Sequence, residues 1–405
     1  MNLAAQLEQA LPPALGAVVR EAAELADHRQ LPLYLVGGPV RDLILGRANT
    51  DLDLVAEGDA IALARACATR WGGTLTTHAA FGTATVLLGA GTSIDFVTAR
   101  RETYPHPAAL PIVMPATIAD DLRRRDFTIN TLALSLAPHS WGDVLDPVGG
   151  VADLHKRLVR VLHDRSFVDD PTRILRAIRF AARLDYGIEA HTRSLLALAL
   201  PYLEQTSSAR ILHELRLLLR EVEPERVLQL HEALGSLPAL AITWQSTWGV
   251  RAFEAARAQP ITGVHDQVLL GLLAPGELRW PAQYPLTVGE QRVFKQVAEL
   301  QGQVLAIEGL QADDALDQLL QPFDTAALLV LRYSRWENTK VVIALTHYLN
   351  NLRPIKTLLT GDDLRVLGLP PGPQYRKVLA ELRAAQLRGV VTDRRSAEAW
   401  VYANR

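Results

Sequence analysis

The sequence predicts an α+β fold in which the strands lie near the N-terminus and helices make up the rest of the chain. Short apolar and β-branched runs bounded by glycines occur before Gly149 and almost vanish after it. Beyond Gly149, apolar residues recur at the three- and four-residue spacing of amphipathic helices, without an internal repeat. A small sheet domain is therefore expected to precede a series of helices.

The composition indicates a folded protein of a reducing compartment. With 405 residues, of which 49% are hydrophobic, the chain can form several domains with real cores. Its net charge of −2 excludes a generally basic surface, so any nucleic-acid contact must come from a local patch. The single cysteine, Cys67, permits no internal disulfide. No apolar run approaches the roughly 18 residues of a membrane span, and the N-terminus lacks a basic signal-peptide start. We expect a cytoplasmic protein without membrane contact; no feature predicts an oligomeric state.

The N-terminal elements follow from local signals. Apolar positions at helical spacing on either side of Pro12-Pro13 predict two short helices over 3–29. Asp59 is expected to N-cap a helix over 60–71 that ends at Gly72-Gly73. Glycine-bounded, β-branched runs then predict strands over 74–77, 83–88 and 93–98.

The segment 33–55 carries the main chemical motif, because an apolar run ends in Gly37-Gly38 and a second one opens with Asp51-Leu52-Asp53. Side chains at i and i+2 of a strand point to one face, so the two aspartates would project together, with Cα atoms roughly 6 to 7 Å apart. Carboxylates suit Mg²⁺, and two such ions can support a phosphoryl displacement. The glycines and the helix start after them would let backbone N–H groups approach an anion.

Each half of this motif also has a plain explanation. Two aspartates near a strand end are more often a solvated turn, and a Gly-Gly pair is more often a tight turn. Their order along the chain is more specific than either alone, and no Walker or dinucleotide-binding glycine pattern follows a strand here. Asp95 lies inside an apolar strand and needs a partner, which is either a hydrogen-bonding neighbour or the metal site of Asp51 and Asp53.

The middle of the chain is read as loop followed by helix. Four prolines and weak periodicity predict a loop over 100–119. The segment 120–136 is expected to lead through its arginines into a helix N-capped by Asp126, with Ile129, Leu132 and Leu136 facing the core. Arg124 and Arg125 are either ordinary surface residues or ligands of phosphate oxygens.

A basic helix is expected after Pro171, N-capped by Asp169 or Asp170 and packed through the apolar stripe Ile174, Ala177, Ile178 and Ala181. Arg173, Arg176 and Arg179 step by three along a neighbouring face. The segment 156–183 is therefore a local basic patch that either binds RNA or is a solvated helix face. The dipeptides His163-Asp164 and His265-Asp266 are expected to be surface or capping residues rather than metal ligands.

Four segments together closely resemble the class II tRNA nucleotidyltransferase and bacterial poly(A) polymerase family, which belongs to the DNA polymerase β-like nucleotidyltransferase superfamily. They read LVGGPVRDLILG with DLDLV, IDFVTARRETY, DDLRRRDFTINTLAL, and DPVGGVADL with DDPTRILRAIRFAARL. The resemblance is dense over 33–192 and thin beyond it, apart from 358–379.

The resemblance implies a catalytic head over 1–150 with a small mixed β-sheet, a helical neck over 151–222 that recognises the base and binds RNA, and a helical body and tail over 223–405 that bind tRNA. Asp51 and Asp53 would bind Mg²⁺, with Asp95 as third catalytic carboxylate. The nucleotide-binding residues implied are Gly37, Gly38, Arg41, Asp42, Arg124, Arg125, Asp170, Arg173, Arg176 and Arg179. Where the family usually has Glu-Arg, this chain has Ala209-Arg210, which puts the packing beneath the base pocket in question.

Asp170 and Arg173 are chemically able to read a base, because a carboxylate only accepts hydrogen bonds and a guanidinium only donates them. Cytosine and adenine both offer an amino donor beside a ring-nitrogen acceptor, whereas uracil and guanine present the reverse. The leading hypothesis is an enzyme that adds C, C and A to tRNA 3′ ends from CTP and ATP with Mg²⁺. The alternatives are an A-adding enzyme, a CC-adding enzyme, a poly(A) polymerase, a small-molecule nucleotidyltransferase and a catalytically silent RNA-binding protein. The resemblance implies that CC-adding members tend to lack a comparable flexible loop, so the long segment 100–119 argues against the CC-adding type.

Overall fold

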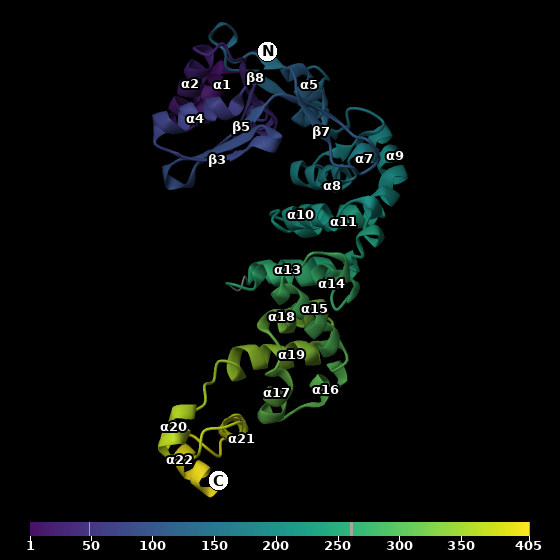
Figure 1. Ribbon diagram of the computed structural model, residues 1–405. Helices are drawn as coiled ribbons and strands as arrows, with labels where there is room; N and C mark the ends of the chain where they lie inside the picture. Colours follow the sequence, from purple (N-terminus) through teal and green to yellow (C-terminus); the bar gives the residue numbers. More distant parts are fainter. Residues whose placement is uncertain (48, 260–261, 405) are drawn as a thin grey trace. The chain divides into compact units, whose positions relative to one another are not determined.

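The computed structural model describes residues 1–47, 49–259 and 262–404, and the chain divides into two compact units, Met1–Glu214 and Leu215–Arg405. All strands of the described residues belong to the first unit, and the second unit consists of helices and loops (Figure 1). The predicted α+β organisation is therefore confirmed. The domain boundaries expected after residues 150 and 222 stay predictions, because a division by compactness alone does not test them.

The first unit contains a seven-stranded mixed sheet with the order β3-β4-β5-β2-β1-β8-β9. Only the β2–β5 pair is parallel. Its register places Asp53 directly opposite Asp95. The strands are β1 (Leu33–Val36), β2 (Leu52–Ala56), β3 (Thr74–His78), β4 (Thr83–Leu87), β5 (Ser93–Thr98), β8 (Ala133–Ser135) and β9 (Val144–Leu145). The sheet thus brings together two carboxylates that lie far apart in sequence.

Helices α2 (Pro13–Asp27) and α4 (Ala60–Trp71) contact each other, and α4 packs on β4 and β5. Asp59 caps α4 by accepting a hydrogen bond from the Ala62 N–H at 2.9 Å, and Gly72 ends the helix in the left-handed conformation. Two further helices, α1 (Ala4–Ala10) and α3 (Gly38–Ile44), complete the N-terminal region. The two predicted N-terminal helices, the capped helix and the three following strands are confirmed.

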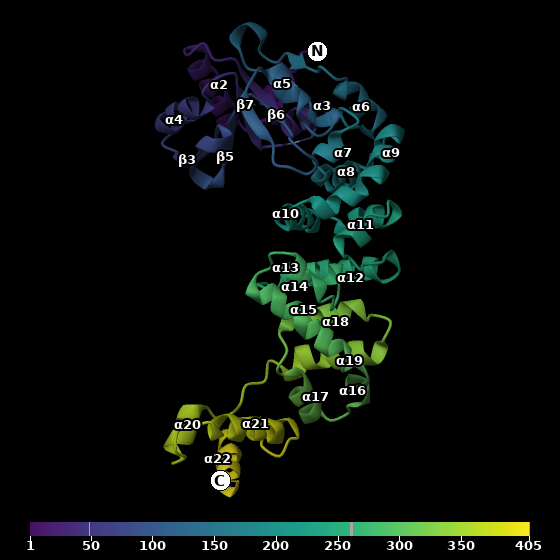
Figure 2. The same cartoon turned by 45° about the vertical axis from the view of Figure 1, so that its right-hand side comes forward.

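The loop expected over 100–119 is wrong. Strand β6 (Arg100–Thr103) pairs antiparallel with β7 (Ile112–Pro115), and helix α5 (Ile118–Arg123) follows. The strands lie beside α5 in both views (Figures 1 and 2). Three of the prolines fall in the turn between the strands, and Pro115 is the last paired residue, where a missing N–H disturbs little. The high proline content concealed two short strand segments.

The helix expected after Asp126 is also wrong. A 3₁₀ turn over Thr128–Asn130 leads instead into β8, which pairs with β1. Asp126 accepts a hydrogen bond from the adjacent Phe127 N–H at 2.9 Å, which is not helix N-cap geometry. The predicted burial of Ile129, Leu132 and Leu136 is nevertheless confirmed. Pairing with a central strand outweighs the local helix signal, because it satisfies the backbone of an almost wholly buried segment.

The first unit continues with α6 (Gly150–Lys156), β10 (Leu158–Val159), α7 (Ser166–Asp169), α8 (Thr172–Leu184), β11 (Gly187–Ile188) and α9 (Ala190–Ala199). Helix α10 (Ser208–Leu219) crosses into the second unit. The predicted apolar stripe of α8 is buried in full. Asp170 stands before this helix and accepts a hydrogen bond from the Thr172 N–H at 3.0 Å, although Pro171 occupies the cap position itself.

The second unit is helical throughout its described residues. Its core contains large aromatic side chains. Trp280 stacks on Phe294 with ring centroids 5.4 Å apart, and Trp244 is also fully buried. No described helix has both the length and the apolar character needed to cross a bilayer. Its α-helices are α11 (Pro224–Ala233), α12 (Ser246–Ala258), α13 (His265–Leu273), α14 (Arg279–Gln283), α15 (Val288–Gln301), α16 (Val304–Gly309), α17 (Asp313–Leu320), α18 (Thr325–Ser334), α19 (Thr339–His347), α20 (Gly361–Val366), α21 (Gln374–Leu387) and α22 (Arg394–Ala403).

Candidate active site

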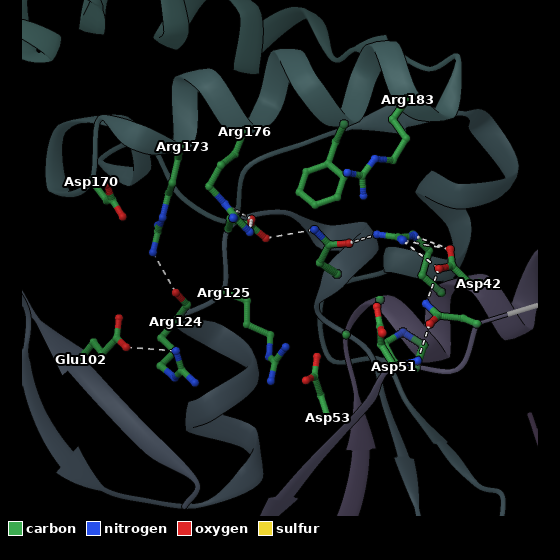
Figure 3. Close-up of a pocket in the computed structure, with 18 of the residues that line it drawn as sticks. Asp42, Asp51, Asp53, Glu102, Arg124, Arg125, Asp170, Arg173, Arg176 and Arg183 are labelled. Atoms are coloured by element: carbon green, nitrogen blue, oxygen red, sulfur yellow. Dashed lines mark hydrogen bonds and ion pairs between the residues drawn. The ribbon is translucent and has the colours of Figure 1, made fainter. Parts of the chain in front are cut away.

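A cavity of about 480 Å³ in the first unit gathers most of the residues predicted to act on a nucleotide (Figure 3). The predicted residues in its lining are Gly37, Gly38, Arg41, Asp42, Asp51, Asp53, Arg124, Arg125, Asp170, Arg173 and Arg176. Asp95 and Arg179 are not part of the described lining. Residues that sequence reasoning did not select also line it, among them Asn49, Glu102, Tyr104, Asn130, Phe180 and Arg183. The glycine turn, the carboxylates and the arginines therefore share one site.

The carboxylates lie on neighbouring strands. Asp53 and Asp95 are partners in the β2–β5 register, and Asp51 precedes Asp53 by two residues. Burial raises the pKa of Asp53, the charges of Asp95 and Asp51 raise it further, and Arg125 opposes them. Thr85 donates a hydrogen bond to Asp95 Oδ1 at 2.5 Å. The hydrogen-bonding neighbour expected for Asp95 is therefore present, whereas its part in a metal site with Asp51 and Asp53 stays a prediction.

These carboxylates do not form a complete metal site. Within the described part of the chain, no three His, Cys, Asp or Glu side chains are grouped closely enough to hold an ion. Mg²⁺ is commonly bound by one or two carboxylates together with waters and substrate phosphates, so a partial protein site is compatible with it. The pKa of Asp53 is raised first by burial and then by the charges of Asp95 and Asp51, so a cation bound beside it would stabilise the ionised carboxylate.

The glycine turn has a steric reason. Gly37 has a φ of +73°, and a Cβ added to it would lie 2.8 Å from Arg125 Nη1. The backbone N–H of Gly37 donates to Leu132 O at 2.9 Å, which ties the turn to the segment before β8. Glycine therefore provides both the left-handed conformation and the space for Arg125. In Figure 3, Arg125 and Asp53 point toward one another.

We expect Gly37→Ala to reduce kcat/KM for the predicted nucleotide addition roughly tenfold or more. The added Cβ would push Arg125 away, and one charge-assisted contact from Arg125 to a phosphate is worth about 1.5–3 kcal/mol. Gly72→Ala is the control for a positive φ without a steric neighbour, since Gly72 has a φ of +66° and nothing within 4 Å of the added Cβ. Gly72→Ala should lose roughly 1–2 kcal/mol of stability because Gly72 is in the left-handed helical region, and Gly37→Ala should lose more because its ψ of −126° is strongly disfavoured for alanine at that φ. Steady-state kinetics and thermal melting measure the two effects, and equal kinetics in both variants would contradict the steric role.

Arg41 and Asp42 are bound to each other. Arg41 is only 5% exposed and donates from Nε to Asp42 Oδ1 at 2.9 Å and from Nη1 to Asn130 Oδ1 at 2.7 Å. Asn49 donates to Asp42 Oδ2 at 2.7 Å. Both predicted residues therefore lie in the cavity wall, within a network that already satisfies much of their hydrogen-bonding capacity.

Arg124 and Arg125 are oriented by Asp121, which is fully buried. Asp121 accepts from Arg124 Nε at 2.9 Å and Nη2 at 2.7 Å, and from Arg125 Nη2 at 3.0 Å. Glu102 on β6 accepts from Arg124 Nη1 at 3.0 Å. Sequence reasoning missed Asp121, although its spacing of three and four residues from the two arginines is the spacing of side-chain pairs on a helix.

The arginines of α8 are committed to carboxylates and carbonyls of the protein. Arg176 donates to Asp126 Oδ2 from Nε at 2.8 Å, and Arg179 donates to Glu214 Oε2 at 3.0 Å. Burial alone would raise the pKa of Asp126, but the charge and hydrogen bonds of Arg176 hold that pKa below its usual value. Arg173 donates from Nη2 to Arg124 O at 2.8 Å, while its buried Nη1 has no hydrogen-bond partner in the described structure.

The idea of a solvated basic face is therefore wrong for Arg173, Arg176 and Arg179 of α8. Arg173 and Arg179 are each 5% exposed, and Arg176 is only partly exposed. The exposed cations of 156–183 are Lys156, Arg157, Arg165 and Arg183. The sequence could not reveal the difference, because the balancing carboxylates Asp126 and Glu214 lie 50 and 35 residues away from Arg176 and Arg179.

Phe180 is a feature that sequence reasoning missed. The guanidinium carbons of Arg41, Arg176, Arg179 and Arg183 lie between 5.4 and 5.7 Å from the centre of its ring. Such cation–π contacts stabilise positive charge at a weakly hydrated site. One aromatic ring thus helps to hold four arginines together, and three of them, Arg41, Arg176 and Arg183, line the cavity.

Asp170 lies at the end of the cavity away from Arg183, where Thr172 and Arg210 hold its carboxylate (Figure 3). Its Oδ1 accepts from Thr172 Oγ1 at 2.6 Å and from Arg210 Nη2 at 2.6 Å. Ala209 is exposed, so the departure from Glu-Arg at this position does not leave a gap beneath the base pocket. Arg210, by contrast, touches a predicted site residue directly.

Comparison with known proteins adds independent information. Residues 33–160 match the family described as "Poly A polymerase head domain". An A-adding tRNA nucleotidyltransferase of Halalkalibacterium halodurans is 35% identical, over 94% of this chain and 90% of the relative. One of Geobacter sulfurreducens is 36% identical over 95% of this chain, which spans only 46% of that relative. Relatives named CC-adding tRNA nucleotidyltransferase and multifunctional CCA protein also match.

Solved structures agree with these relatives. The structure of a Thermotoga maritima CCA-adding enzyme complexed with tRNA is 27% identical, with a TM-score of 0.79 over 100% of this chain and 98% of that chain.

Proposed function

The chain belongs to the tRNA nucleotidyltransferase family, and from this premise we propose that it extends the 3′ end of tRNA with C and A, using CTP and ATP without a nucleic-acid template. The observation that carries the proposal is that Asp170 and Arg173 both line this cavity, as an acceptor and a donor. The single cysteine is consistent with a cytoplasmic enzyme, where tRNA would be its partner.

Asp170 and Arg173 together present an acceptor beside a donor. Arg173 Nη1 is buried and has no hydrogen-bond partner in the described structure, so a small movement of the side chain would let it donate to a ring nitrogen of cytosine or adenine without breaking a bond of Nη1 to the protein. The amino group of either base would donate to the Asp170 carboxylate. Uracil and guanine would set a carbonyl against that carboxylate and a ring N–H against Arg173, a mismatch of about 1–3 kcal/mol for each unpaired group. The pair therefore supports selection of C and A from the four bases.

Asp51 and Asp53 fit a divalent cation, and Mg²⁺ is the ion we propose. When bound there, Mg²⁺ would offset phosphate charge and lower the pKa of the attacking 3′ hydroxyl. Asp95, held by Thr85, would orient that hydroxyl as the third catalytic carboxylate. Arg125, beside Asp53, would neutralise developing negative charge on the phosphates, with the backbone of Gly37 and Gly38 close by. These roles require the carboxylates to face the part of the cavity wall that carries Arg125.

Addition of A alone is the second candidate. The two A-adding relatives are 36% and 35% identical over most of this chain, against 31% for a CC-adding relative, and the proposed base pocket accepts adenine as readily as cytosine. The β6–β7 hairpin occupies the segment whose length argued against a CC-adding enzyme.

The purified chain should be incubated with tRNA lacking CCA and with tRNA ending in CC, each with single nucleotides and with CTP plus ATP. Sequencing of the 3′ ends reads the product. We expect C, C and A to be added to the first tRNA and A to the second, in each case only with a divalent cation. Extension of the CC-ending tRNA alone would support A addition, and no extension of either would overturn the proposal.

A further inference from the structure

We infer that Arg210 is a positioning residue for base selection, which fixes the Asp170 carboxylate so that its Oδ2 faces the incoming base. The inference rests on the proposed function, because it concerns how the base-reading pair is held. Arg210 lies on α10, 40 residues from Asp170 in sequence, and the resemblance did not assign it a contact with the nucleotide.

In the described structure, all the hydrogen bonds of the Asp170 carboxylate converge on one oxygen. Oδ1 accepts from the Thr172 N–H at 3.0 Å, from Thr172 Oγ1 at 2.6 Å and from Arg210 Nη2 at 2.6 Å. No described residue donates to Oδ2. The side chains of Asp170 and Arg210 are 18% and 24% exposed, so the ion pair is largely removed from water. A saturated Oδ1 leaves Oδ2 as the acceptor available to a ligand.

Arg210 holds this carboxylate from a second anchor point. Its Nη1 donates to the backbone carbonyl of Ala108 at 3.3 Å. Ala108 lies in the turn between β6 and β7, and its own N–H donates to Val168 O on α7 at 3.1 Å. The guanidinium is a planar fork with fixed angles between its N–H groups, so a carbonyl bound to one arm restricts the position of the other. The direction of the Asp170 carboxylate is therefore set by backbone as well as by its own rotamer.

Thr172 alone cannot supply this restraint. It follows Asp170 by two residues and moves with it, whereas Arg210 is attached to another helix and to the β6–β7 turn. Loss of Arg210 should let the carboxylate rotate and shift. Cytosine and adenine would lose a well-directed acceptor for their amino group, while uracil and guanine, which have no such donor at that position, would lose little. The expected result is a selective loss.

The test measures kcat/KM for CTP, ATP, UTP and GTP on tRNA ending before C or A, in the wild type and in Arg210→Gln and Arg210→Lys. The preference for CTP and ATP over UTP and GTP should fall at least tenfold in Arg210→Gln. Arg210→Lys keeps the charge but not the fork, so it should recover only part of the preference, and it replaces the glutamine variant if that one fails to fold. Arg20→Gln is the control, because it breaks an exposed ion pair with Glu8 outside the cavity.

A second readout separates positioning from general support of the fold. In an Asp170→Asn background, Arg210→Gln should change the nucleotide preference no further, since its effect passes through that carboxylate. An equal slowing of all four nucleotides, or an additive effect in the double variant, would overturn the inference. A wild-type enzyme that does not distinguish the nucleotides would instead refute the proposed base pocket, whereas normal selection by the wild type and by both Arg210 variants would refute only the role of Arg210.

Discussion

Replacing Asp53 by asparagine is expected to abolish nucleotide addition while making the folded chain more stable. The substitution removes a proposed metal ligand and leaves a side chain of the same shape. It also removes a negative charge that is disfavoured first by burial and then by Asp95 and Asp51. We expect a loss of kcat of at least a thousandfold, about 4 kcal/mol of transition-state stabilisation. Nucleotide addition should be lost while the melting temperature rises.

The gain in stability should depend on pH in a defined direction. The pKa of Asp53 is raised in the folded state, so the folded carboxyl takes up its proton at a higher pH than the unfolded one. Above its folded pKa, the ionised group therefore destabilises the fold, and this penalty disappears as pH falls toward the unfolded value of about 4. Thermal melting in a metal chelator should show Asp53→Asn above the wild type at pH 7.5 and close to it near pH 4.

A second inactivating variant and one control accompany this experiment. Asp51→Ala should also inactivate the enzyme if both carboxylates bind metal. Asp27→Asn removes an exposed aspartate of α2 outside the cavity and should leave turnover unchanged. Wild-type turnover in a folded Asp53→Asn or Asp51→Ala protein would refute the proposed metal site.

The strands and the cap around Asp51 and Asp53 were largely predictable from the sequence, because the signals for them are local. The spacing of Asp51 and Asp53, the cap at Asp59 and the glycine-bounded strands each depend on a few adjacent residues, and the structure places them as expected. Asp95 could be selected because an aspartate within an apolar strand needs a partner. Its position opposite Asp53 required the parallel pairing of β2 with β5, which no local pattern specifies.

The missed features depend on contacts between distant segments. Arg210 bridges Asp170 and Ala108, which are 40 and 102 residues away from it. The β6–β7 hairpin was hidden because prolines fill its turn, while its short strands carry little apolar pattern of their own. Charge alone was similarly misleading for α8, since an arginine in a solvated face and one in a buried ion pair look the same in sequence. Partner and burial, rather than residue type, decide what these side chains can do.

Arg173→Ala should reduce nucleotide selection more than it reduces turnover. In the free protein, Arg173 donates from Nη2 to Arg124 O, and its Nη1 is the buried group without a partner. Removing the side chain takes away the donor for N3 of cytosine or N1 of adenine, but leaves Asp51, Asp53 and Asp95 to carry out the chemistry. The preference for CTP and ATP should shrink by roughly tenfold or more, since a hydrogen bond from a charged group is worth about 1.5–3 kcal/mol. The part-buried carbonyl of Arg124 also loses its donor, so a lower melting temperature is expected as well.

Asp170→Asn tests the opposite edge of the base. An amide can turn a donor toward O4 of uracil, so kcat/KM for UTP should rise relative to that for CTP. Arg20→Ala provides the matched loss of an arginine far from this pair in sequence and outside the cavity lining, and should leave all four nucleotides in their wild-type ratio. If Asp170 served only to start α8 and Arg173 only to support Arg124 or to bind phosphate, both variants would slow the four nucleotides by a common factor. The ratio of kcat/KM values on tRNA ending before C or A is therefore the decisive measurement. An unchanged ratio in Arg173→Ala and Asp170→Asn would show that selection of C and A arises elsewhere in the cavity, because a residue that reads the base must alter the relative rates when its hydrogen-bonding pattern changes.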